Sequence, residues 1–133
     1  MFFNLFLTLI ISLLLITSTE AKDIYFKYDS SGNMLQKTIA YDENNHKVVE
    51  YYNSGAVKAI GHYKNGRKNG CWLTYDQNGN ILSRAFFDNG QRTGIWNIRA
   101  QFQDFEYRIA YEDGRTNSIK KVNLDGRLIS TLY

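Results

Sequence analysis

The sequence predicts an all-β protein: an antiparallel meander of repeated β-hairpins, in units of about 24 residues, preceded by an N-terminal apolar signal helix. Three observations predict this fold: a unit that recurs along the chain, turn dipeptides at regular intervals, and short runs of alternating side chains between the turns. Proline is absent, and aromatic residues reach 15%, with ten Tyr and eight Phe. Tyr and Phe favour the pleated, half-buried surface of a sheet, so the composition agrees with the pattern.

The N-terminal segment, residues 1–21, differs from the remainder of the chain. It begins with an almost wholly apolar run and ends in mostly small residues, a pattern typical of a secretory signal peptide. Thr19 and Ala21 predict cleavage before Lys22, and the alternative is an uncleaved membrane anchor. Either alternative predicts an exported protein (periplasm, cell surface or secreted), with residues 22–133 as a single domain.

The charge and cysteine content exclude several classes of protein. The formal net charge is +3, and because Glu20 is the only charged residue before Lys22, the remaining domain carries +4. This charge is spread along the chain, and its densest run, Lys64 to Lys68, is one loop rather than the extended basic face of a nucleic-acid-binding protein. Cys71 is the only cysteine, which excludes a disulfide within the chain.

An internal repeat organises the predicted domain. One unit spans residues 51–72 and the next spans residues 75–96. Six positions match at a spacing of 24: Tyr51 and Tyr75, Gly55 and Gly79, Tyr63 and Phe87, Gly66 and Gly90, Gly70 and Gly94, and Trp72 and Trp96. Weaker copies on both sides give about four units, with degraded outer units as expected for the ends of an array.

The turn dipeptides predict how each unit folds. Eight of the ten glycines follow Asn, Asp or Ser, and pairs such as Asn65–Gly66 and Asn89–Gly90 suit type I′ hairpin turns. Between turns, side chains alternate between two faces of a strand. One face of two equivalent strands carries Val57, Ala59, Gly61 and Tyr63, and Ile81, Ser83, Ala85 and Phe87. The small residues in the middle of this face predict either a close-packed layer or a sharp bend.

We expect six repeated residues to have structural roles: Gly66, Gly70, Trp72, Gly90, Gly94 and Trp96. The glycines serve turns and bends. The two tryptophans should occupy equivalent positions, either as core residues that set the packing or as an aromatic strip for a ligand.

The segment from Gly61 to Ile81 has the pattern G-x-Y-K-N-G-x-K-x-G-x-W-x-x-Y-x-x-x-G-x-I. This pattern resembles the MORN repeat, in the bacterial variant found in proteins labelled YwqK-like antitoxins. The resemblance is close over residues 51–96 and looser over roughly 25–129. It implies a β-hairpin array that contacts proteins or membrane lipids and has no catalytic residues. In an exported chain, an antitoxin-like role would be that of an immunity-like partner of an extracytoplasmic toxin.

The sequence offers little chemistry for catalysis, so we predict no enzyme, no catalytic residues, no cofactor and no metal. His46 and His62 are the only histidines, and Cys71 aligns with the apolar Ile95 of the next unit, as a buried, inert thiol would. Acidic residues in the turns suggest either a calcium site or ordinary capping of the turn backbone, and the glycine-aspartate nonapeptide of strong calcium repeats is absent.

We therefore predict a binding module whose partner is another protein. Its tentative contact residues are aromatic and basic: Tyr63, Lys64, Arg67, Lys68, Tyr75, Phe87 and Arg92. The alternative is binding to a membrane surface or an envelope polymer. An open meander also has edge strands, so we expect the last strand, residues 128–133, to cap the array or to mediate self-association with a second copy.

Overall fold

The computed structural model describes residues 23–100 and 102–132, most of which lie in strands. The predicted signal peptide or anchor, residues 1–21, lies outside the described residues. In chain order the strands are β1 (Asp23–Tyr28), β2 (Met34–Ala40), β3 (Asn45–Tyr51), β4 (Val57–Lys64), β5 (Arg67–Tyr75), β6 (Ile81–Asp88), β7 (Gln91–Arg99), β8 (Phe105–Glu112), β9 (Arg115–Asn123) and β10 (Leu128–Thr131).

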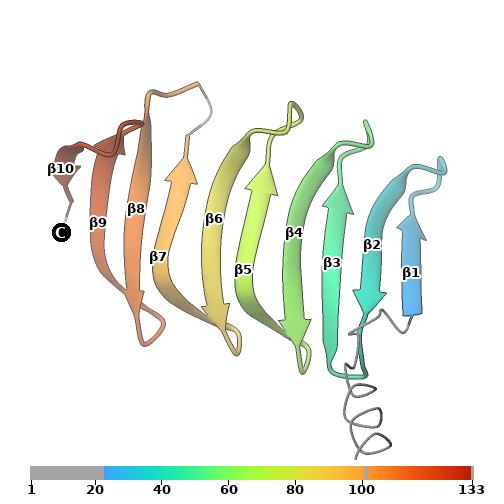
Figure 1. Cartoon of the computed structure of the whole chain (residues 1–133). Helices are drawn as coiled ribbons and strands as arrows, with labels where there is room; N and C mark the ends of the chain where they lie inside the picture. Colours follow the sequence, from blue (N-terminus) through green and yellow to red (C-terminus); the bar gives the residue numbers. More distant parts are fainter. Residues whose placement is uncertain (1–22, 101, 133) are drawn as a thin grey trace, which may run out of the picture.

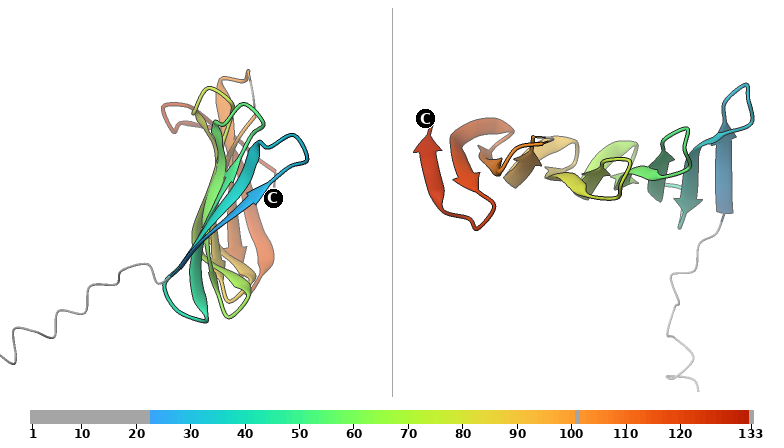
Figure 2. Two further views of the ribbon diagram at one scale, coloured as in Figure 1. Left: turned by 90° about the vertical axis from the view of Figure 1, so that its right-hand side faces the viewer. Right: turned by 90° about the horizontal axis from the view of Figure 1, so that it is seen from above.

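The ten strands form one sheet in which each strand pairs antiparallel with its neighbours in the sequence (Figure 1). The predicted all-β meander is therefore confirmed, and β10 is its last strand, paired with β9. The two views in Figure 2 show a single twisted layer, with no further element of the described chain packed on either face. Within the described residues, the structure contains no helix that is long and apolar enough to span a membrane.

Two kinds of turn alternate along the sheet. At one end, two-residue turns join the strands, and both residues have positive φ, as in Asn65 (50°) with Gly66 (72°) and Asn89 (48°) with Gly90 (86°). These angles are those of type I′ turns, as the sequence predicts for these two pairs. Asn69–Gly70, a further turn dipeptide of the sequence, instead lies within β5, where the prediction of a turn is wrong. At the other end, longer turns recur, in which the first backbone N–H donates to the carbonyl four residues later, as from Asp76 to Asn80.

The two tryptophans sit at equivalent irregularities of the sheet. The register shifts between Ile60 and His62 in the β4–β5 pair and between Arg84 and Phe86 in the β6–β7 pair. In both places the indole donates a hydrogen bond across the shift: Trp72 Nε1 to the His62 carbonyl at 3.1 Å, and Trp96 Nε1 to the Phe86 carbonyl at 2.9 Å. Each indole therefore satisfies a backbone acceptor where the strand ladder is interrupted.

Gly61 explains why the first of these tryptophans is the more deeply buried. A Cβ atom on Gly61 would overlap the indole carbons of Trp72, so the ring lies directly on the glycine backbone. Trp72 is 5% exposed, whereas Trp96, whose unit has Ala85 in place of Gly61, is only half-buried. The small residues predicted in the middle of this face thus belong to a close-packed layer.

The core is thin because a single layer leaves both faces of the sheet open to solvent. Among the described residues only six apolar side chains are buried: Val48, Val49, Ala59, Trp72, Ala85 and Val122. Four of them lie together on one face of the sheet: Trp72 and its neighbours Val48, Ala59 and Ala85. A large share of the packing energy therefore depends on this one tryptophan and its neighbours.

We predict that Gly61→Ala lowers the free energy of unfolding by about 1–3 kcal/mol, because the added methyl group displaces the Trp72 ring and strains its hydrogen bond. Urea denaturation followed by tryptophan fluorescence measures the loss. The matched control is Ala85→Gly at the equivalent position, which places no added atom against an indole. It should cost about 0.5–1 kcal/mol through added backbone freedom and up to about 0.8 kcal/mol through the lost buried methyl group. A Gly61→Ala protein as stable as the parent would contradict this account of the packing.

Candidate binding surface

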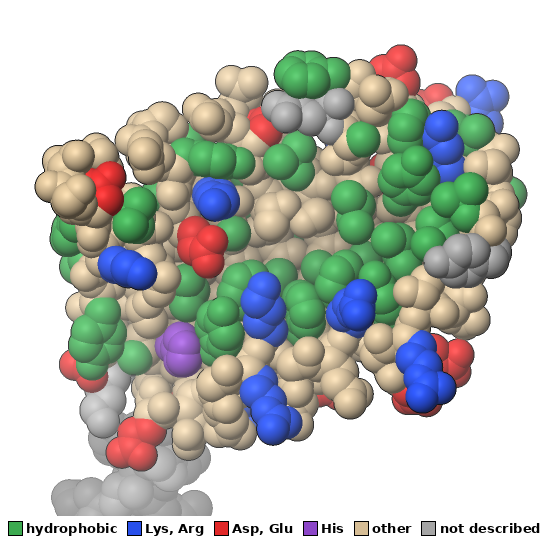
Figure 3. Space-filling view, turned by 180° about the vertical axis from the view of Figure 1, so that it is seen from behind, with side chains coloured by type: hydrophobic (Ala, Val, Ile, Leu, Met, Phe, Trp, Pro, Cys, Tyr) green, Lys and Arg blue, Asp and Glu red, His purple; other side chains and the backbone are tan. Residues whose placement is uncertain are grey.

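Six rings in sequential contact cross six neighbouring strands, from β3 to β8, on one face of the sheet. We call them the aromatic ladder, and the face that carries them the ladder face: His46, Tyr63, Trp72, Phe87, Trp96 and Tyr111. Successive ring centroids are 5.2, 5.2, 6.4, 5.0 and 4.7 Å apart. In Figure 3, hydrophobic side chains form a band across the sheet, with one His at its end and Lys and Arg side chains lying over it.

The strand register places these rings together. His46 lies opposite Tyr63 in the β3–β4 pair, and opposed residues of an antiparallel pair point to the same face. The repeat then carries an aromatic residue to the same height in later strands, so that Phe87 occupies in β6 the position of Tyr63 in β4. Each ring contacts the next at a tilted, stacked or edge-on angle, geometries that aromatic pairs favour.

Two basic side chains lie on the ladder at equivalent repeat positions. The Lys68 ammonium is 4.1 Å from the ring centroid of Trp72 and 5.2 Å from that of Phe87. The Arg92 guanidinium carbon is 5.1 Å from the ring centroid of Tyr111. Such cation–π contacts contribute about 0.5–1 kcal/mol each at exposed sites. The ladder face is therefore both aromatic and locally positive.

The structure brings together four of the seven predicted contact residues and separates the other three. Tyr63 and Lys68 lie opposite each other in the β4–β5 pair, and Phe87 and Arg92 lie opposite each other in the β6–β7 pair. Lys64 and Arg67 also pair, but their side chains point to the other face of the same hairpin. Tyr75 lies at the far end of β5, where its carbonyl accepts a hydrogen bond from the Tyr52 hydroxyl.

The structure adds two ladder residues that were not among the predicted contacts. Tyr111 had a signal in the sequence, because it repeats Phe87 at a spacing of 24. His46 had none, because its repeat equivalent is Gly70, and only the β3–β4 register places it on Tyr63. The two structural tryptophans also belong to the ladder, so packing and a ligand-facing aromatic strip are combined in one feature.

The side chains that could take part in catalysis or bind a metal are dispersed over the sheet. His46 lies on the ladder face, whereas Cys71 lies opposite Phe86 on the other face and is half-buried. Burial, together with the nearby charge of Lys47, lowers the pKa of His62 below its ordinary value of 6.5. Among residues 23–100 and 102–132, no group of three or more His, Cys, Asp or Glu side chains is arranged to hold a metal ion.

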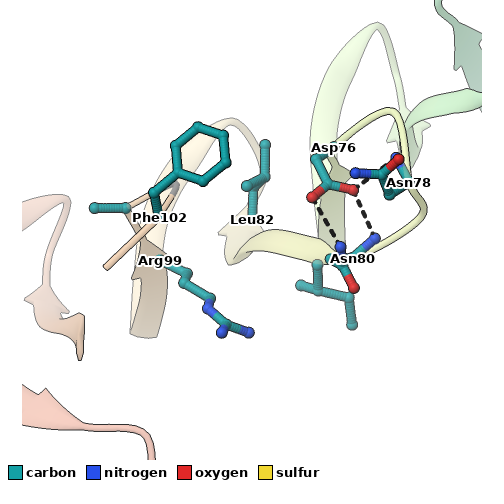
Figure 4. A pocket seen from close by; sticks show the side chains of 8 residues that line it. Asp76, Asn78, Asn80, Leu82, Arg99 and Phe102 are labelled. Atoms are coloured by element: carbon teal, nitrogen blue, oxygen red, sulfur yellow. Dashed lines mark hydrogen bonds between the residues drawn. The ribbon is translucent and has the colours of Figure 1, made fainter. Parts of the chain in front are cut away.

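The turn carboxylates serve their own turns. Asp76 accepts hydrogen bonds of 2.8 Å from the backbone N–H of Asn80 and 2.9 Å from its side-chain amide (Figure 4). Asp29 makes the equivalent bonds to Asn33, at 2.8 and 2.9 Å. The open pocket in Figure 4, lined also by Leu82, Arg99 and Phe102, thus has a carboxylate that is already occupied within its turn. These observations favour the capping role over the calcium site.

The fold and the ladder define a class of protein: an array of paired strands that presents one extended surface. Two segments, residues 45–65 and 68–89, match the MORN repeat variant family. These segments cover the β3–β4 and β5–β6 pairs, at the centre of the sheet, where the chain is similar to that family. The chain matches no curated protein. The outer strands continue the same antiparallel pairing beyond the matched segments.

The turn carboxylates predict how stability responds to acid. The Asn33 and Asn80 amides, with backbone N–H groups, hold the pKa values of Asp29 and Asp76 below 3.8 in the folded chain. A carboxyl group with a depressed pKa stabilises the fold above its unfolded pKa, and this contribution is lost as the pH falls through the folded pKa.

We therefore expect the melting temperature to fall as the pH decreases through and below about 3.8, with a shallower fall in the double variant Asp29→Asn, Asp76→Asn. Thermal melts followed by circular dichroism at a series of pH values test this. An identical acid slope in the parent and the double variant would show that these two turns do not carry the effect.

Proposed function

We propose that this chain is an exported, non-enzymatic binding module that recognises another protein through its ladder face. The MORN repeats and the single open layer support a surface built for contact. The apolar residues 1–21 support export. An immunity-like role, in which the partner is an extracytoplasmic toxin, is one form of this proposal.

The observation that carries the proposal is the placement of Lys68 and Arg92. Among the described residues, the ion pairs are Arg108 with Glu106 and Arg127 with Asp125, so neither cation on the ladder is neutralised by a carboxylate. A partner surface with carboxylates set among apolar groups would fit this face. Aromatic residues and Arg are enriched among the residues that dominate binding energy at interfaces.

The test starts with crosslinking in intact cells by a reagent that does not cross membranes, followed by mass spectrometry of the captured partner. Binding of that purified partner is then measured for Lys68→Met and Arg92→Met. Methionine keeps an apolar stem over the rings and removes the charge, so folding should be preserved. The matched control is Arg67→Met, on the other face of the β4–β5 hairpin.

We expect each ladder variant to weaken binding by about tenfold or more, and the Arg67 control to bind as the parent does. All three proteins should melt at nearly the same temperature. Equal affinity for the ladder variants and the parent would exclude this face as the contact surface. Failure of the external reagent to label the chain would contradict export.

A second candidate function rests on a basic row across the other face. Arg84 lies opposite Asn97, Asn97 opposite Arg108, and Arg108 opposite Lys120, so four side chains follow one line over β6 to β9. Glu106 neutralises only Arg108, whose Nε lies 2.9 Å from its carboxylate. This row supports binding to an anionic membrane surface or envelope polymer, to which each basic residue contributes about 1 kcal/mol.

Co-sedimentation with vesicles of anionic phospholipid tests the second function. We expect binding at low salt that disappears at high salt, and a clear loss in the double variant Arg84→Gln, Lys120→Gln. Neutral phosphatidylcholine vesicles and the Lys68→Met variant are the controls. If the parent does not sediment with anionic vesicles at low salt, this candidate is discarded and the protein-binding proposal is unaffected.

A further inference from the structure

The N-terminal edge of the sheet is apolar and open. Among the described residues, β1 (Asp23–Tyr28) is the first strand in the sheet order and pairs only with β2. Its large side chains are exposed: Ile24 by 50%, Tyr25 by 58%, Phe26 by 52% and Tyr28 by 56%. An edge strand of this kind presents unpaired backbone groups and apolar side chains, and so is a template for pairing with another strand.

The sequence of β1 is complementary to itself in the antiparallel direction. We propose that two copies of the chain form a two-fold dimer through β1, centred on Tyr25. Tyr25 then lies opposite Tyr25 of the second copy, Ile24 opposite Phe26, and Asp23 opposite Lys27. Aromatic, apolar and opposite-charge pairs are each favourable when directly opposed in a sheet. The two-fold axis repeats the last two pairs, so all five residues gain a partner.

The side-chain directions agree with this register. In the β1–β2 pair Asp23, Tyr25 and Lys27 point to one face, opposite Ala40, Thr38 and Gln36, and Ile24 and Phe26 point to the other face. Charged residues therefore meet across the axis on one side and apolar residues meet on the other. Neither Asp23 nor Lys27 is among the ion pairs of the described chain, which leaves both charges available to a second copy.

Other registers of the same strand lose this match. A slip of two residues places Lys27 opposite Tyr25 and removes both charge pairs. A slip of one residue places the charged face of one copy beside the apolar face of the other, because side chains alternate with a period of two. The charges that usually protect an edge from pairing therefore select one register here.

The C-terminal edge is also exposed and apolar, at Leu128 and Ile129, but it lacks self-complementary charges. β10 (Leu128–Thr131) has four residues, none of them charged, and its register with β9 shifts between Leu128 and Ser130. Pairing of β10 with β1 of another copy is the competing arrangement. Because the sheet has ten strands, copies related by translation would meet antiparallel at these two edges and extend into an open filament. A two-fold β1 pair closes at two copies.

A dimer of this form would place both ladder faces on the same side of one continuous sheet, because its two-fold axis is perpendicular to the sheet. Two ladders side by side would give avidity for a partner that repeats. This consequence rests on the proposed function, whereas the dimer itself does not, and hydrodynamic measurements distinguish the two.

Charge exchange tests the dimer. Sedimentation velocity is measured over a concentration series for the parent chain, for Asp23→Lys, for Lys27→Asp and for the double exchange. Each single variant sets like charges opposite each other twice, and should raise the dimer dissociation constant by about tenfold or more. The double exchange restores opposite charges and should restore the dimer. Circular dichroism checks that all four proteins are folded.

A crosslink tests the register. In a Cys71→Ser background, Tyr25→Cys places two thiols across the axis, at a Cα separation of about 4.5–5.5 Å that a disulfide can bridge. Mild oxidation with diamide should give covalent dimers. The matched control Ile24→Cys lies opposite Phe26 and should give few, until it is mixed with Phe26→Cys. A parent that remains monomeric, species that grow beyond a dimer, or a double exchange that fails to recover would overturn the proposal.

Discussion

The packing of Trp72 on the backbone of Gly61 is the contact on which the remainder of this sheet depends. A one-layer sheet has no second layer to bury its side chains, so it must gain its packing within one face. Here the absent side chain of Gly61 lets an indole lie flat on the strand, and the indole donates a hydrogen bond to the His62 carbonyl beside the register shift. Packing and polar satisfaction are thus provided by one side chain.

The next repeat has the same indole hydrogen bond, but its tryptophan is less buried. Trp96 makes the same bond to the Phe86 carbonyl, but its unit has Ala85 in place of Gly61 and its ring is only half-buried. The next unit has Lys120 at a spacing of 24 residues from Trp96, but Lys120 lies on the other face, and Tyr111 ends the ladder. The best-packed part of the sheet is therefore its centre, which also contains the two segments that match the MORN repeat variant.

Much of this architecture could be predicted from the sequence, because its causes are local or periodic. Asn65–Gly66 and Asn89–Gly90 form type I′ turns, and a spacing of 24 residues makes Trp72 and Trp96 equivalent without any knowledge of the fold. The placement of single side chains could not be predicted in the same way. Tyr75 is a strong repeat position, yet it lies at the far end of its strand from Lys68. Arg67 and Lys68 are adjacent in sequence, and the pleat sends them to opposite faces.

An open meander also needs a reason to stop, since nothing in its hydrogen bonding limits the number of strands. At the C-terminal edge, β10 is short and its pairing with β9 is irregular, which makes it a poor template for a further strand. At the N-terminal edge, β1 is exposed and apolar, and it pairs regularly with β2 from Asp23 to Lys27 before a register shift at Tyr28. These are properties that invite uncontrolled pairing. Asp23 and Lys27 lie symmetrically about Tyr25 and would restrict this pairing to one two-fold dimer. Only a second copy in that register places an opposite charge beside each of them. The two edges would then end the array by different means, one by irregular pairing and the other by self-complementary charge.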